Sequence, residues 1–73
     1  MPFDTKTVEL IAIGASVAAN CIPCLQTHRQ NALETGLTEQ EIKEAMEVGK
    51  IVRAGATSSM DKLIKDTAYT PTG

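Results

Sequence analysis

The residues best suited to chemistry are two cysteines and a histidine within residues 21–28, in the run Cys-Ile-Pro-Cys-Leu-Gln-Thr-His. Cys21 and Cys24 are the only cysteines of the protein, and His28 is its only histidine. Thiols at this spacing can close a small disulfide ring. His28 follows Cys24 by four residues, so on a helix the two side chains share a face, one turn apart. The spacing indicates a dithiol redox site in which His28 exchanges a proton with Cys24.

The cysteine pair is also expected at the start of a helix, because Pro23 is typical of a helix's first turn. The unpaired N–H groups and the dipole at a helix N-terminus stabilise a thiolate, which is the reactive form of cysteine. A neutral His28 could accept the thiol proton, and a protonated one would further stabilise the thiolate.

Glu9 is the candidate to orient or charge the imidazole, because no other ionisable side chain lies between Val8 and Cys21. Its helix is apolar nearly all round and is therefore expected to be buried on every side. Glu9 would then be desolvated, and a desolvated carboxylate is a good proton acceptor. The alternative is a glutamate near the helix start that reaches water. If the two helices form an antiparallel hairpin that turns near Cys21, a rise of ~1.5 Å per residue places Glu9 about one helical turn farther from the hairpin's turn than His28. A bend near Gly14, a steep helix crossing or a second subunit would have to close that gap.

Two other functions fit the same residues. Cys21, Cys24 and His28 could supply three zinc ligands, with a carboxylate as the fourth, although structural zinc sites usually draw on a second cysteine or histidine pair. The two cysteines could instead be inert apolar side chains in a structural oligomerisation module. A c-type haem would need the histidine directly after the second cysteine, and no strand pattern supports a thioredoxin fold.

The hydrophobic pattern predicts four helices and no strand. The first is capped by Asp4 or Thr5 and runs to about Asn20, and the second ends at Gly36. Thr38 and Glu41 form a capping box that begins a third helix. This helix is expected to end at Gly55, and Ser58 to begin a short fourth one, with a frayed tail over residues 66–73. The third helix should turn Ile42, Ala45, Met46, Gly49 and Val52 inward and pair Glu39 with Lys43 and Glu47 with Lys50.

Length and composition indicate one all-α domain over residues 1–73, a bundle of about four helices completed by homo-oligomerisation. With 73 residues, one Phe, one Tyr and no Trp, the core is small and a monomer would be marginally stable. The net charge of −2 comes without a basic patch, so no nucleic-acid partner is expected. No signal peptide or membrane span is expected either. We therefore expect a cytoplasmic location, where paired cysteines are more often catalytic or metal-binding than structural.

The run KTVELIAIGASVAANCIPCLQTH, followed by NALETGLTEQEIKEA, resembles the alkylhydroperoxidase D-like proteins of the carboxymuconolactone decarboxylase superfamily. The resemblance covers residues 6–56 and rests on Glu9 together with the Cys21-x-x-Cys24-x-x-x-His28 motif. It implies an all-helical fold and homo-oligomers, commonly trimers or hexamers. It also implies that Glu9, Cys21, Cys24 and His28 form a catalytic proton-relay redox centre.

By this resemblance the chain is a thiol-dependent peroxidase or disulfide oxidoreductase. Cys24 attacks a hydroperoxide, Cys21 resolves the sulfenic acid as a disulfide, and a thiol reductant restores the dithiol. No organic cofactor and no metal are implied, because the cysteine pair carries the electrons. The decarboxylase branch is less favoured, because the dithiol motif marks the redox branch. The chain departs from the family in being shorter than its better-known peroxidases and in having Ile22 and Pro23 between the cysteines.

Overall fold

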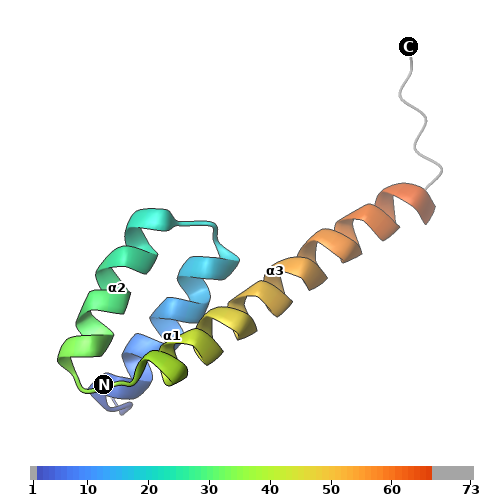
Figure 1. The fold of residues 1–73 in the computed structure, drawn as a ribbon. Helices are drawn as coiled ribbons and strands as arrows, with labels where there is room; N and C mark the ends of the chain where they lie inside the picture. Colours follow the sequence, from blue (N-terminus) through green and yellow to red (C-terminus); the bar gives the residue numbers. More distant parts are fainter. Residues whose placement is uncertain (1, 67–73) are drawn as a thin grey trace.

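The computed structural model describes residues 2–66, and three helices account for most of them. They are α1 (Thr5–Ala18), α2 (Ile22–Glu34) and α3 (Glu39–Asp66), and no strand occurs within residues 2–66. Helix α1 packs against both α2 and α3, which barely contact each other, and α3 extends far beyond the other two (Figure 1). The all-α prediction is confirmed.

The helix boundaries follow the capping residues. Asp4 accepts a hydrogen bond from the N–H of Thr7 at 2.8 Å and so begins α1. Thr38 and Glu41 form the predicted capping box, because Glu41 accepts from the N–H of Thr38 at 3.0 Å and Thr38 accepts from the N–H of Glu41 at 3.1 Å. Gly36 follows α2 with a φ of 94°, a left-handed conformation that glycine adopts without strain.

The predicted break between a third and a fourth helix is wrong, because α3 runs without interruption through Gly55 and Ser58. A single glycine inside a helix costs only about 1 kcal/mol relative to alanine and does not by itself end the helix. The hydroxyl of Thr57, in the turn after Gly55, donates to the carbonyl of Arg53 at 3.1 Å. In the continuous helix the backbone N–H groups of this turn bond to carbonyls four residues earlier, so no N-cap is needed there.

The core is small and lies where the three helices meet. Ile13 and Ile42 are the largest fully buried side chains, and Ala32 and Leu37 complete the buried apolar group. Helices α1 and α3 lie very close together at Gly49, where a Cβ would lie 2.5 Å from the carbonyl oxygen of Gly14. The absence of a side chain at Gly49 is therefore required for α3 to pack on α1.

One face of α1 remains open, contrary to the expectation that this apolar helix is buried on every side. Only two helices pack on it, so Ile11 is 54% exposed, and Val52 of α3, predicted to face inward, is 56% exposed. Together they line a largely apolar groove of about 590 Å³ between α1 and α3. The residues lining this groove are Leu10, Ile11, Gly14, Ala15, Ala18, Glu41, Glu44, Ala45, Val48, Gly49 and Val52.

The C-terminal half of α3 projects beyond the body of the molecule (Figure 1). Every side chain of residues 54–66, called here the arm, is exposed, including Met60 and Leu63 at 57% and 56%. Within residues 2–66, none of the helices is both long enough and apolar enough to cross a membrane. The predicted frayed tail lies outside the described residues, apart from Asp66, which is the last residue of α3.

Candidate functional site

Cys21 lies at the junction between α1 and α2 and belongs to the caps of both helices. Its N–H donates to the carbonyl of Ser16 at 2.9 Å, and the N–H of Asn20 donates to the carbonyl of Val17 at 3.1 Å. These two bonds form a Schellman motif, with Asn20 in the left-handed conformation at a φ of 56°. The sulfur of Cys21 also accepts from the N–H of Cys24 at 3.3 Å, as the N-cap of α2. The backbone of both helices therefore fixes the position of this cysteine.

The two cysteines are joined as a disulfide, with their Cα atoms 5.2 Å apart. Cys24 is exposed, whereas Cys21 is half-buried. Both cysteines lie at the start of α2 as predicted, and Pro23 lies in its first turn. The structure therefore shows the oxidised form of the pair, with Cys24 the sulfur more accessible to a reactant.

Glu9 and His28 are in direct contact within one chain. Nδ1 of His28 lies 2.8 Å from Oε2 of Glu9, and the Glu9 side chain is 11% exposed. The contact needs no second subunit, so the level difference of about one turn is closed within the chain. When Nδ1 carries a proton it donates to the carboxylate, which leaves Nε2 as a proton acceptor. His28 itself lies one turn after Cys24 on α2.

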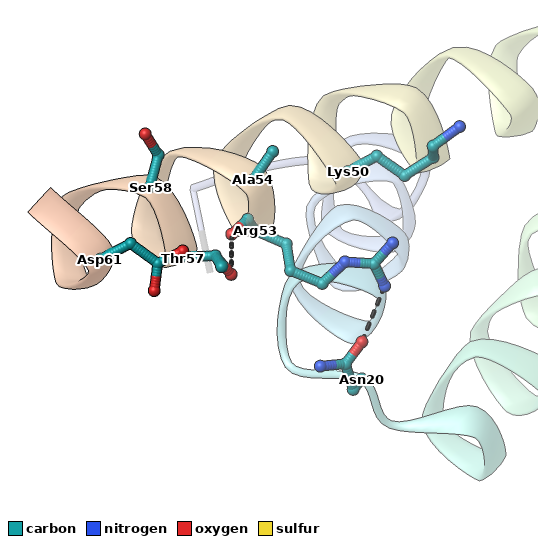
Figure 2. Close-up of a pocket in the computed structure, with 7 residues that line it drawn as sticks. All are labelled: Asn20, Lys50, Arg53, Ala54, Thr57, Ser58 and Asp61. Atoms are coloured by element: carbon teal, nitrogen blue, oxygen red, sulfur yellow. Dashed lines mark hydrogen bonds between the residues drawn. The ribbon is translucent and has the colours of Figure 1, made fainter.

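Arg53 of α3 holds the junction that carries Cys21, a role that the sequence did not reveal. Its Nη1 donates to Oδ1 of Asn20 at 2.7 Å (Figure 2). The same nitrogen donates to the carbonyl of Val17 at 3.3 Å. The carbonyl of Val17 is also an acceptor in the Schellman motif. An asparagine after a helix is a recognisable C-terminal signal, but nothing in the sequence pairs it with an arginine 33 residues away.

The described residues give no support to a metal site. Within residues 2–66, no group of three or more His, Cys, Asp or Glu side chains is arranged to hold a metal ion. Both sulfurs that the zinc hypothesis needs are engaged in the disulfide. On the surface, Glu47 pairs with Lys50 at 3.4 Å as predicted. Glu39 instead accepts two bonds of 2.9 Å from Arg29 of α2, so its predicted pairing with Lys43 is not the one formed.

Residues 2–60 match the model of the carboxymuconolactone decarboxylase family. A protein of Paracoccus denitrificans described as "Uncharacterized protein 4 in cox locus" is 36% identical over 53 residues, which cover 73% of this chain and 48% of that protein. Two proteins named "Alkyl hydroperoxide reductase AhpD", from Anaeromyxobacter sp. (strain K) and Anaeromyxobacter dehalogenans, are each 32% identical over 50 residues.

The matches to the two hydroperoxide reductases cover 68% of this chain but only 27% of each relative. The chain thus spans about half or less of the length of these relatives. No solved structure gives a significant match to the chain.

Proposed function

This chain belongs to the carboxymuconolactone decarboxylase family, and we propose that it is a dithiol oxidoreductase that reduces hydroperoxides or disulfides through Cys21 and Cys24. One observation carries the proposal: a disulfide at the start of α2 is followed, one turn later, by a histidine held by a buried carboxylate. Once the disulfide is reduced, this arrangement supplies two electrons, a thiolate-stabilising position and a proton acceptor. The names of the two reductases give independent support.

The first step is attack by Cys24 on a hydroperoxide. His28 takes the thiol proton of Cys24 at Nε2, while Glu9 holds its Nδ1–H and stabilises the imidazolium. The thiolate attacks the terminal peroxide oxygen, an S–O bond forms, the O–O bond breaks and the alcohol leaves with the proton. Cys24 is then a sulfenic acid and the hydroperoxide has been reduced to an alcohol. The greater exposure of Cys24 favours it as the attacking residue.

In the second step Cys21 attacks the sulfur of the Cys24 sulfenic acid. An S–S bond forms, and hydroxide leaves as water by taking the proton of the Cys21 thiol. The product is the disulfide form. A dithiol or two thiols from a reductant then restore both cysteines by exchange and become a disulfide themselves. In the disulfide reductase reaction, the reduced pair gives the same two electrons to a substrate disulfide.

The direct test is to reduce the protein and add one equivalent of tert-butyl hydroperoxide. The wild-type chain should lose two thiols and two hydrogens of mass. Cys21→Ser should stop at the sulfenic acid, which dimedone traps on Cys24. Cys24→Ser should react with the peroxide no faster than a free cysteine. A sulfenic acid on Cys21 in Cys24→Ser, with full activity, would contradict the assignment of the attacking residue.

The remaining outcomes separate the alternatives. If the reduced protein resists hydroperoxides but is oxidised by a small disulfide such as oxidised glutathione, disulfide reduction is the better description. If it reacts with neither oxidant, the thiols are inert and a structural module is favoured. Retention of one zinc per chain by the reduced protein, with loss of structure on chelation, would instead support the metal-binding hypothesis.

We also infer that the working form is a homo-oligomer in which the arm of one copy lies in the α1–α3 groove of another. A helical segment of about this length is only marginally stable in water unless it packs against something. The groove is largely apolar and Glu41 and Glu44 line it, while the arm carries Lys62 and Lys65 together with Asp61 and Asp66. The apolar surfaces of arm and groove therefore match, and Lys62 and Lys65 can pair with the two glutamates of the groove. Native mass spectrometry of the intact chain tests this inference through the number of copies.

A further inference from the structure

A second hollow, separate from the groove, opens beside the disulfide. Its volume is about 390 Å³, within the range of small-molecule sites. Its walls are the apolar side chains of Val17, Ile22, Leu25 and Met46, together with Cys21. The Cα atoms of Cys21 and Cys24 are 5.2 Å apart, so a molecule bound in this cleft would have one end near both cysteines.

The ionisable residues that line the cleft are both cationic. Lys50 and Arg53 are three residues apart on α3, and Figure 2 shows both side chains extending in the same direction from the helix. Ser16 and Asn20 supply the remaining polar lining. A carboxylate does approach Lys50, since Glu47 lies 3.4 Å from its Nζ, but both side chains of this pair are more than half exposed and such pairs are weak.

Arg53 retains capacity for a further partner. Its bonds to Asn20 and Val17 are both donated by Nη1, so these two bonds do not use the N–H groups on the other guanidinium nitrogens. A guanidinium and an ammonium that line the same cleft can both attract a carboxylate. The cleft therefore combines apolar walls with two cationic side chains and a cysteine of the proposed redox pair.

We propose that the cleft selects substrates with an apolar chain ending in a carboxylate, such as the hydroperoxide of a fatty acid. The chain lies on Val17, Leu25 and Met46, the carboxylate on Lys50 and Arg53, and the peroxide reaches the dithiol. The assignment of the peroxide rests on the proposed function. The binding of a carboxylate-terminated chain does not, so the two can be tested separately.

Binding is measured first, on the oxidised intact chain, with octanoate and the uncharged octanamide as probes. Amide NMR signals of Cys21, Leu25 and Met46 should shift with both probes. Octanoate should bind about tenfold more tightly, the gain expected of a charged hydrogen bond. Lys50→Gln should bring the ratio toward one, whereas Lys62→Gln, which removes the same charge from the arm, should leave it unchanged. Equal affinity of the two probes, or shifts confined to other residues, would overturn the proposal.

Rates of thiol oxidation are measured next with a fatty-acid hydroperoxide, its methyl ester and tert-butyl hydroperoxide. The acid should react about tenfold faster than the ester, Lys50→Gln should bring the ratio of the two rates toward one, and Lys62→Gln should leave this ratio and the rate with tert-butyl hydroperoxide unchanged. Equal rates for acid and ester would overturn the substrate assignment. If no hydroperoxide oxidises the protein, the proposed peroxidase function fails, and the octanoate measurement still decides whether the cleft binds carboxylates. Arg53→Lys, which keeps the charge, should retain most of the octanoate preference.

Discussion

Nδ1 of His28 lies 2.8 Å from Oε2 of Glu9, although 19 residues separate them in the chain. The contact joins α1 to α2 and places a largely buried carboxylate behind the only histidine of the protein. An imidazole held in this way has a fixed ring orientation and a preferred tautomer, which are what proton transfer from a neighbouring thiol requires. In the proposed mechanism Glu9 is therefore a positioning residue that acts through His28.

The first prediction concerns Glu9→Gln, which keeps a hydrogen-bond acceptor for His28 but removes the negative charge. Oxidation of the reduced protein by tert-butyl hydroperoxide should slow by about 10–100-fold, because the imidazolium formed during thiol deprotonation loses its stabilising partner. Stopped-flow measurement across pH 5–9 should also show a changed pH profile, which a merely structural effect would not produce.

The matched control is Glu34→Gln, which removes the same charge from the exposed end of α2. It should leave both the rate and the pH profile unchanged. Equal rates for Glu9→Gln and the wild-type chain, with the helical signal intact in both, would show that the Glu9 contact has no part in thiol chemistry.

The second prediction uses two glycines of α3 with opposite surroundings. Gly49→Ala should destabilise the fold by about 1–3 kcal/mol, because the new Cβ would meet the carbonyl of Gly14 and the side chain of Val17. Gly55→Ala should stabilise it by about 0.5–1 kcal/mol, because nothing lies within 4 Å and alanine favours helix. Urea denaturation midpoints provide the comparison. Similar midpoints for both variants would contradict the close α1–α3 packing.

Local signals in the sequence predicted much of the fold. The helix ends lie where the capping residues predicted them, at Asp4, at Gly36 and at the pair Thr38 and Glu41. These ends are predictable because a cap depends only on residues a few positions apart. The break at Gly55 was wrong because one glycine inside a helix costs only about 1 kcal/mol relative to alanine and does not by itself end the helix.

The candidate site shows the same division between local and long-range information. The spacing of Cys21, Cys24 and His28 along one helix was readable from the sequence, because positions on a helix are fixed by its period. The contact of Glu9 with His28 depends on how two helices cross, which a count of rise per residue does not capture. The bond from Arg53 to Asn20 depends on the packing of α3 against α1 and has no local signature.

The third prediction concerns acid stability at the two helix starts. Hydrogen bonds from Thr7 hold the pKa of Asp4 below its ordinary value of 3.8. Hydrogen bonds from the backbone N–H and the hydroxyl of Thr38 hold the pKa of Glu41 below its ordinary value of 4.5. A carboxylate with a lowered folded-state pKa stabilises the fold above its unfolded-state pKa, and this stabilisation is lost as the pH falls through the folded-state value.

The Asp4→Asn, Glu41→Gln double variant keeps the hydrogen-bonding groups but cannot titrate. It should be less stable than the wild-type chain at pH 7, and the difference should shrink below pH ~4.5 and disappear at lower pH. Urea midpoints at pH 7, 5, 4 and 3 measure this. A difference that stays constant over the whole range would mean that the charges of these caps contribute nothing.

The fourth prediction tests the proposed packing of the arm in the groove by charge reversal. Glu44→Lys places a cation on the groove rim, where it would face Lys62 and Lys65 of a second copy's arm, and self-association should weaken by about tenfold. Adding Lys62→Glu should restore most of the lost affinity, because opposite charges then face each other again. Sedimentation velocity at low and high salt measures both effects, which should be smaller at high salt.

Glu34→Lys makes the same charge change at the end of α2, away from the groove, and should leave self-association unchanged. The restoring double variant is the decisive measurement, because loss of affinity alone could follow from any damage to α3. Association that Glu44→Lys weakens and Lys62→Glu does not restore would place the arm elsewhere. Wild-type association by Glu44→Lys would show that the groove rim does not meet the arm at all.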